Sequence, residues 1–221
     1  MQKFQGAKAI LFDIDDTLFP SSRFSYLARK KAINAMIKAG MGASPSSASS
    51  ALSKIIKKLG ANSSHHFDLL SKKYKCKNKS RCVAAGVHAY HCAKSSIRPF
   101  PGARKTLLYL RKKYLLCAAS EGKALKQWDK LIRLRLGTLF SQVFVTELRH
   151  GGKTPAFYKK IAKKLKIPPQ KIIMVGNSPQ KDILAAKAAG MQTIHILQGK
   201  NRQKCGANAR ISKISEIARL L

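Results

Sequence analysis

The chain has 221 residues, enough for one α/β domain or for a core with a small insertion. Its apolar content of 45% excludes a wholly disordered chain, and no apolar run approaches the roughly 20 residues of a membrane span. Lys and Arg number 44 against nine acids, which gives a formal net charge of +35 and predicts attraction to polyanions at low salt. The five cysteines are odd in number, and no signal peptide precedes the first apolar run. We therefore expect unpaired thiols and a cytoplasmic location.

The first apolar run, residues 9–12, has the length of a buried strand and leads directly into an acidic loop. Asp13, Asp15 and Asp16 of this loop are three of the nine acids in the chain. Carboxylates this close repel one another unless a cation neutralises them. Because ligands of open α/β sheets bind beyond the carboxyl ends of the strands, we expect a functional site here.

From about residue 21 the pattern becomes helical. Helices are expected at about 25–39, 45–59, 64–74 and 81–96, the second of them starting at the N-cap Ser44 with Pro45 in its first turn. The turn-rich segment 98–102 closes this all-helical stretch. We therefore expect a helical domain, 20–97, inserted into a core made of 1–19 and 98–221.

After residue 102, predicted strands alternate with predicted helices. The strands are expected at 115–119, 142–145, 171–175 and 192–196, and the helices at about 103–113, 123–135, 156–165, 180–189 and 213–220. Such alternation predicts an α/β fold with a parallel sheet covered by helices.

Three of these strands are followed by residues suited to phosphoryl transfer. Ser120 offers a hydroxyl donor, although an N-cap would explain it equally well. Lys153 precedes the helix start at Thr154, although a solvated lysine is the ordinary expectation. Asp182 follows Asn177 in the loop after the strand at 171–175, and an acid near a helix N-terminus is also favourable by itself. The set in this order is more specific than any single member.

The ordered set resembles the four motifs of the haloacid dehalogenase (HAD) superfamily, most of whose members are Mg²⁺-dependent phosphatases. The resemblance spans residues 8–199. The stretches 62–70, 88–91, 97–102 and 126–131 are similar to a group of small archaeal HAD phosphatases, some described as acting on glyceraldehyde 3-phosphate. The resemblance implies a Rossmann-like three-layer core, with the inserted helices forming a C1 cap over the active site.

The resemblance also implies roles for individual residues. Asp13 would be the nucleophile and Asp15 the general acid and base, while Ser120 and Lys153 would hold the phosphoryl oxygens. Magnesium would be held by Asp13, the backbone carbonyl of Asp15, Asn177 and Asp182. The sequence departs from the family pattern at Asn177, where Asp is usual, and in the shortened segment 153–157. The missing carboxylate at position 177 predicts weaker metal binding.

These residues predict a cytoplasmic, Mg²⁺-dependent phosphatase that hydrolyses a small phosphorylated metabolite through an aspartyl-phosphate, as a monomer or homodimer without membrane association. A phosphomutase stays open. So does a basic HAD-like protein that binds nucleic acid non-specifically, or a phosphatase of nucleic-acid ends. The cations are spread over nearly every predicted helix without interleaved aromatics, which favours a dispersed surface charge over a dedicated nucleic-acid face.

Overall fold

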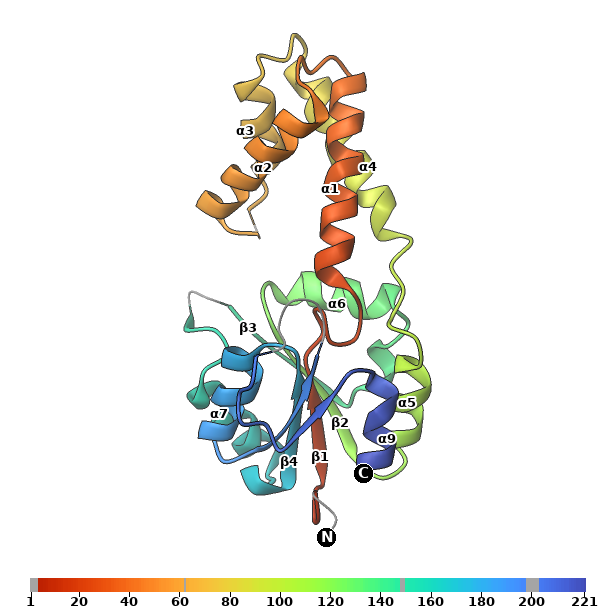
Figure 1. Cartoon of the computed structure of the whole chain (residues 1–221), viewed down its shortest axis with the longest axis vertical. Helices are drawn as coiled ribbons and strands as arrows, with labels where there is room; N and C mark the ends of the chain where they lie inside the picture. Colours follow the sequence, from red (N-terminus) through yellow and green to blue (C-terminus); the bar gives the residue numbers. More distant parts are fainter. Residues whose placement is uncertain (1–3, 62, 148–149, 198–202) are drawn as a thin grey trace. The chain divides into compact units, whose positions relative to one another are not determined.

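The structure is a computed structural model that describes residues 4–61, 63–147, 150–197 and 203–221 (Figure 1). Asn62 and residues 148–149 and 198–199, which belong to the resemblance described above, lie outside the described residues. The chain divides into two compact units, Met1–Pro20 with Arg98–Leu221, here called the sheet unit, and Ser21–Ile97, here called the helical unit. None of the helices in the described ranges is long and apolar enough to cross a membrane.

The sheet unit is built on six parallel strands in the order β3-β2-β1-β4-β5-β6. They are β1 (Ala9–Phe12), β2 (Leu115–Glu121), β3 (Gln142–Thr146), β4 (Ile172–Gly176), β5 (Gln192–Ile196) and β6 (Ala209–Ile211). The predicted parallel α/β fold is confirmed. This is the doubly wound order in which the chain reverses its direction of progress across the sheet between β1 and β4. A ligand crevice is therefore expected beyond the carboxyl end of β1.

Both faces of the sheet are covered. The helices of this unit are α5 (Ala103–Leu110), α6 (Ala124–Arg133), α7 (Pro155–Leu165), α8 (Ala185–Ala188) and α9 (Ile217–Leu220). Leu11, Cys117 and Met174, which share one register level of the sheet, pack with Tyr158 and Ile161 of α7. Figure 1 shows α5 and α9 on the opposite side of the sheet from α7. All four residues of β1 are buried, as expected for a parallel strand between two helical layers.

Two segments differ from the sequence-based expectation. The strand β6 was not predicted, because three residues are too short for a recognisable pattern and only pairing with β5 defines them. The helix expected at 180–189 begins as a π-helix, Pro179–Leu184, before α8. Short 3₁₀ segments lie at Gly137–Leu139, Pro169–Lys171 and Ile214–Glu216, the last of them opening the expected terminal helix.

The helical unit contains α1 (Ser21–Lys38), α2 (Pro45–Leu59), α3 (His66–Lys73) and α4 (Lys79–Lys94). Met36, Leu52, Leu70 and Cys82, one from each helix, are buried together in its core. The predicted cap of α2 is present, since Ser44 Oγ accepts a hydrogen bond of 3.2 Å from the backbone N–H of Ser47. This unit therefore has an apolar core of its own.

Candidate active site

A cavity of about 310 Å³ lies at the expected crevice, and all its lining residues belong to the sheet unit. They are Asp13, Asp15, Asp16, Ser120, Glu121, Lys153, Asn177, Ser178, Lys181 and Asp182. The structure thus brings together all six residues singled out in the sequence. Five of the nine acids of the chain line this one cavity.

Lys153 joins the two buried carboxylates of the cavity. Its Nζ lies 2.5 Å from Asp13 Oδ1 and 2.7 Å from Asp182 Oδ1, and its side chain is 3% exposed. The preceding Gly152 has φ = 67°, a left-handed conformation that suits glycine. The following Thr154 caps α7 by accepting a hydrogen bond of 3.4 Å from the N–H of Phe157. Together these local features set the lysine inside the cavity rather than in solvent.

The electrostatics of this cluster leave its negative charge only partly compensated. Burial raises the pKa of Asp13 to about 7; Lys153 lowers it, while the carboxylates of Asp182 and Asp15 raise it further. Burial opposes the charge on Lys153, but Asp13 and Asp182 outweigh it and hold the lysine pKa above its ordinary value. Burial thus outweighs the attraction of Lys153, and the neighbouring carboxylates add to the rise in the pKa of Asp13.

Asp182 is fixed by the π-helix in which it lies. Its Oδ2 accepts a hydrogen bond of 2.9 Å from the N–H of Ser178, whose own Oγ caps the turn at Lys181. A Cβ atom on Gly176 would lie only 2.4 Å from the carboxyl group of Asp182. Glycine at the end of β4 is therefore what allows the carboxylate to approach the strand this closely.

Asn177 lies between Gly176 and this turn, and a buried histidine supports it. His195 Nε2 of β5 lies 3.2 Å from the backbone oxygen of Asn177. Burial lowers the pKa of His195, although its contact with that carbonyl works in the opposite direction. The buried imidazole of His195 therefore supports the backbone of the loop that carries Asn177.

Ser120 is the polar side chain in the cavity that most clearly needs a ligand. It lies in β2, and its Oγ is buried without a hydrogen-bond partner among the described residues. Leaving a buried hydroxyl unsatisfied costs about 1–3 kcal/mol, so such groups call for an explanation. A phosphoryl oxygen in the adjacent cavity would supply the missing acceptor.

Three charged residues of the site were not found from the sequence. Glu121 Oε1 accepts a hydrogen bond of 2.6 Å from Lys181 Nζ, and Lys130 Nζ lies 2.6 Å from Asp15 Oδ2. Glu121 could have been suspected, since it follows Ser120 directly and acids are scarce. Lys130 lies in the stretch 126–131 that carries part of the resemblance, but nothing in the sequence assigned it a role, and nothing distinguished Lys181 among 44 cations.

The side chains of the cavity could bind a hard cation such as Mg²⁺ only by combining carboxylate oxygens with other oxygen ligands. Within the described ranges, no three His, Cys, Asp or Glu side chains converge closely enough to hold a metal by themselves. Asp13 and Asp182 would therefore need additional oxygens, and Asn177 is the lining residue that carries a neutral amide oxygen. Carboxylate and amide oxygens are the ligands that Mg²⁺ prefers, so this mixed set suits the ion.

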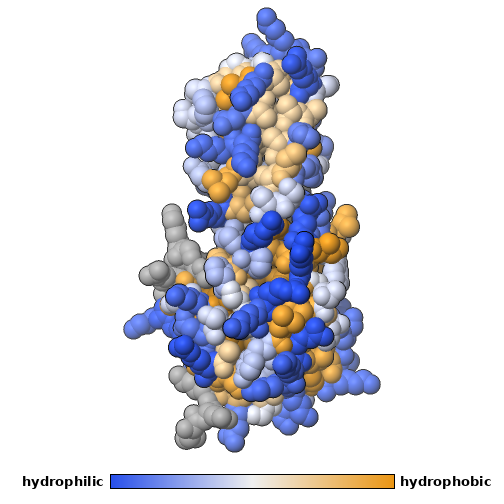
Figure 2. Space-filling model, turned by 90° about the vertical axis from the view of Figure 1, so that its right-hand side faces the viewer, coloured by the Kyte–Doolittle hydropathy of each residue, from blue (hydrophilic) through white to orange (hydrophobic). Residues whose placement is uncertain are grey.

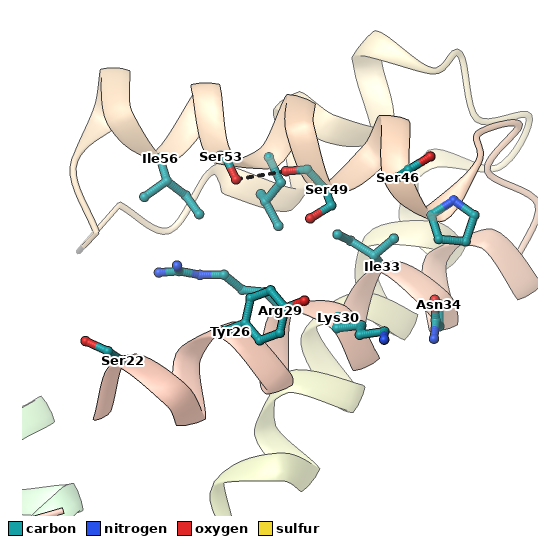
Figure 3. A pocket seen from close by; sticks show the side chains of 12 residues that line it. Ser22, Tyr26, Arg29, Lys30, Ile33, Asn34, Ser46, Ser49, Ser53 and Ile56 are labelled. Atoms are coloured by element: carbon teal, nitrogen blue, oxygen red, sulfur yellow. Dashed lines mark hydrogen bonds between the residues drawn. The ribbon is translucent and has the colours of Figure 1, made fainter. Parts of the chain in front are cut away.

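A second cavity, of about 320 Å³, lies within the helical unit between α1 and α2 (Figure 3). Tyr26, Arg29 and Lys30 of α1 face Ser49 and Ser53 of α2 across it, and buried apolar side chains from both helices form its floor. No acid lines this groove, because the chain has none between Asp16 and Asp68. The groove therefore offers donors to an anion and no carboxylate to compete for them.

The parallel sheet with an acidic crevice at its switch point defines a doubly wound α/β protein with a ligand site beyond the carboxyl end of β1. The family model of haloacid dehalogenase-like hydrolases matches residues 7–190. The chain belongs to this family.

Relatives of known activity are similar over most of the chain. A glyceraldehyde 3-phosphate phosphatase from Pyrococcus furiosus is 40% identical over 196 residues, which cover 87% of this chain and 82% of the relative. An enzyme of the same description from Methanothermobacter thermautotrophicus is 40% identical over 193 residues, covering 86% and 85%. These relatives confirm the resemblance seen in the sequence, and the chain is a phosphoric monoester hydrolase.

Solved structures share the fold at lower identity. A haloacid dehalogenase-like hydrolase from Xanthomonas campestris has a TM-score of 0.72 at 18% identity, covering 98% of this chain and 96% of that one. An HAD phosphatase from Thermococcus onnurineus has a TM-score of 0.70 at 22% identity, with coverages of 96% and 97%.

Proposed function

We propose that this enzyme is a cytoplasmic, Mg²⁺-dependent phosphatase that hydrolyses a small phosphorylated metabolite through an aspartyl-phosphate on Asp13. The observation that carries this proposal is the arrangement around Asp13. Its buried carboxylate lies against Lys153, in the same cavity as the partnerless hydroxyl of Ser120. A nucleophile, a cation and a hydroxyl donor in one cavity are what the transfer of an anionic phosphoryl group requires.

In the first half of the reaction, a carboxylate oxygen of Asp13 attacks the phosphorus. As that bond forms, the ester P–O bond breaks, and the leaving oxygen takes a proton from the carboxylic acid of Asp15 to become an alcohol. Lys153 Nζ and the Ser120 hydroxyl bind phosphoryl oxygens and stabilise the charge that gathers on them.

In the second half, water attacks the phosphorus of the aspartyl-phosphate and gives a proton to Asp15. Inorganic phosphate leaves and the carboxylate of Asp13 is restored, so that atoms and protons balance over the cycle. Asp13, the backbone carbonyl of Asp15, Asn177 and Asp182 would hold the magnesium ion. When bound, the ion reduces the repulsion between the anionic nucleophile and the anionic phosphate.

The relatives, which are named for glyceraldehyde 3-phosphate, support a proposal for the substrate class. We infer that this enzyme acts on a triose phosphate or a similar small phosphomonoester, and that the helical unit serves as the cap of the family. The groove between α1 and α2 supports an anion-binding role for the helical unit, because the side chains of Arg29 and Lys30 have no hydrogen bond or ion pair within the described part of the chain.

The test is a phosphomonoester panel assayed with Mg²⁺ and with excess chelator. It should contain glyceraldehyde 3-phosphate, glycerol 1-phosphate, 4-nitrophenyl phosphate and a 5′-phosphorylated oligonucleotide. We expect Mg²⁺-dependent release of inorganic phosphate from the small esters. Turnover of the oligonucleotide alone would replace this proposal with a phosphatase of nucleic-acid ends, and isomerisation without phosphate release would indicate a mutase.

A further inference from the structure

The stretch 126–131, which the sequence analysis singled out, has a role in the structure that the reaction above does not use. Its most conspicuous residue, Trp128, is 42% exposed on the outer side of α6. Gln127 and Lys130 lie three residues apart and therefore share one face of the helix, which is directed toward the active site.

Lys130 holds the carboxylate of Asp15 by both of its oxygens. The distances from Lys130 Nζ are 2.7 Å to Asp15 Oδ1 and 2.6 Å to Asp15 Oδ2. The ammonium group also lies 5.9 Å from the centroid of the Phe19 ring, and Phe19 pairs with Asp15 through an isolated parallel bridge. Lys130 thus interacts with two residues of the acidic loop, the carboxylate of Asp15 and the ring of Phe19.

Gln127 fixes Lys130 in turn. Its Oε1 accepts a hydrogen bond of 3.2 Å from Lys130 Nζ, and its Nε2 donates one of 2.9 Å to the backbone oxygen of Glu121. Gln127 is itself buried, with 3% exposure, so its amide group is held in a fixed place. A continuous polar chain therefore links the end of β2, beside Ser120, to the carboxylate of Asp15.

We propose that Lys130, held by Gln127, is a positioning residue that sets the orientation of Asp15 for proton transfer; this rests on the function proposed above for Asp15. The Asp15 side chain is 33% exposed, so without a partner it would sample several orientations. A proton donor must present one oxygen to the leaving group, and small misplacements are costly in such sites. The ammonium group of Lys130 contacts both carboxylate oxygens of Asp15, so it can stay hydrogen-bonded to one oxygen while the other gives and receives the proton.

The test exploits the difference between good and poor leaving groups. An alkoxide needs protonation as it leaves, whereas 4-nitrophenolate hardly does, so only alkyl phosphates depend on a well-placed acid. For Lys130→Met we expect kcat on glycerol 1-phosphate to fall about 30-fold and kcat on 4-nitrophenyl phosphate to fall about twofold. Gln127→Leu should give the same pattern at about fivefold, and Lys130→Arg should recover most of the loss.

Two further variants distinguish the proposed role of Lys130 from the role proposed for Asp15. Lys163→Met removes one exposed positive charge from the last turn of α7 and should leave both rates unchanged. Asp15→Asn should show the larger selective loss, and adding Lys130→Met to it should not deepen the selectivity, because the two residues act as one unit.

Each outcome has a distinct meaning. If Asp15→Asn slows both substrates equally, the role assigned to Asp15 fails. If Asp15→Asn is selective while Lys130→Met and Gln127→Leu slow both substrates equally or not at all, the positioning role of Lys130 is overturned. Should Lys130→Met fail to fold, Gln127→Leu with melting temperatures alongside decides the question in the same way.

Discussion

Both units of this chain are rich in Lys and Arg, but they differ in what faces those cations. The helical unit has one acid, Asp68, and its groove is lined by Arg29 and Lys30 without a carboxylate. The sheet unit has the other eight acids, and five of them line the active-site cavity. The comparison shows that a net charge of +35 says little by itself. Function follows the few positions where cations and acids are brought together.

The lysines of the site make the same point. Lys153 and Lys130 are each paired with carboxylates of the acidic loop, and Lys181 is paired with Glu121. On the face of the molecule shown in Figure 2, by contrast, strongly hydrophilic residues are spread over both units without gathering at one spot. Because 44 of the charged residues are Lys or Arg and only nine are acids, such dispersed hydrophilic residues suit weak attraction to polyanions better than specific recognition.

The largest expected effect comes from neutralising one acid in each unit. Asp13→Asn should lower kcat by at least about 10³-fold on every substrate, because it removes the proposed nucleophile. Asp68→Asn in α3 makes the same chemical change in the helical unit and should alter kcat less than twofold. Steady-state kinetics of the two variants would check this. Substantial turnover by Asp13→Asn would exclude Asp13 as the nucleophile.

A second prediction asks whether either unit has a dedicated polyanion face. Binding to duplex DNA should be independent of sequence and should weaken about 10²–10³-fold between 50 and 200 mM salt. Arg29→Met/Lys30→Met in the helical unit and Lys105→Met/Lys163→Met in the sheet unit should each weaken it by about the same two- to threefold. Fluorescence anisotropy at several salt concentrations would measure these changes. A large loss in only one double variant would reveal a specific nucleic-acid surface.

Much of the fold and of the site could be predicted because both follow local rules. The parallel sheet follows from alternating strands and helices, and the meeting of Asp13, Ser120 and Asp182 follows from their places after parallel strands. The short strand β6 could not be predicted, because pairing rather than pattern defines it. Lys130 could not be predicted either, since its role depends on which face of α6 is turned toward the acidic loop. That orientation is decided by tertiary packing.

The third prediction concerns the incomplete set of acidic ligands. Asn177 brings an oxygen but no charge to the cavity, so Asn177→Asp should lower the half-saturating Mg²⁺ concentration about tenfold, corresponding to about 1.4 kcal/mol. Titrations of rate against Mg²⁺ would separate affinity from turnover, since the added carboxylate could also slow the chemistry by repulsion. An unchanged or higher half-saturating concentration would mean that position 177 does not limit metal binding by its charge.

The smallest expected effect is on the free energy of unfolding. It tests whether burying the acids of the sheet unit destabilises the fold. Burial raises the pKa of Asp13 from 3.8 to about 7 in the metal-free enzyme. The protonated form is therefore favoured by folding, and its stabilising contribution is complete below pH 3.8 and is lost as the pH rises through about 7.

Asp13→Asn keeps a neutral side chain at every pH, so it should gain stability relative to the wild type between pH 5 and pH 8. Three pKa units, which already include the attraction of Lys153, would give about 4 kcal/mol in a rigid site; because the site relaxes around an ionised carboxylate, we expect a net gain of about 1 kcal/mol at pH 8. Urea unfolding with chelator at pH 5.0 and pH 8.0 would measure it, with Asp68→Asn as the matched control. Because Mg²⁺ should bind the ionised wild-type carboxylate, adding it should shrink the difference at pH 8. A stability difference that does not change with pH would show that folding does not raise the pKa of Asp13. The two units would then differ in where their acids lie, but not in the free energy of unfolding that those acids cost.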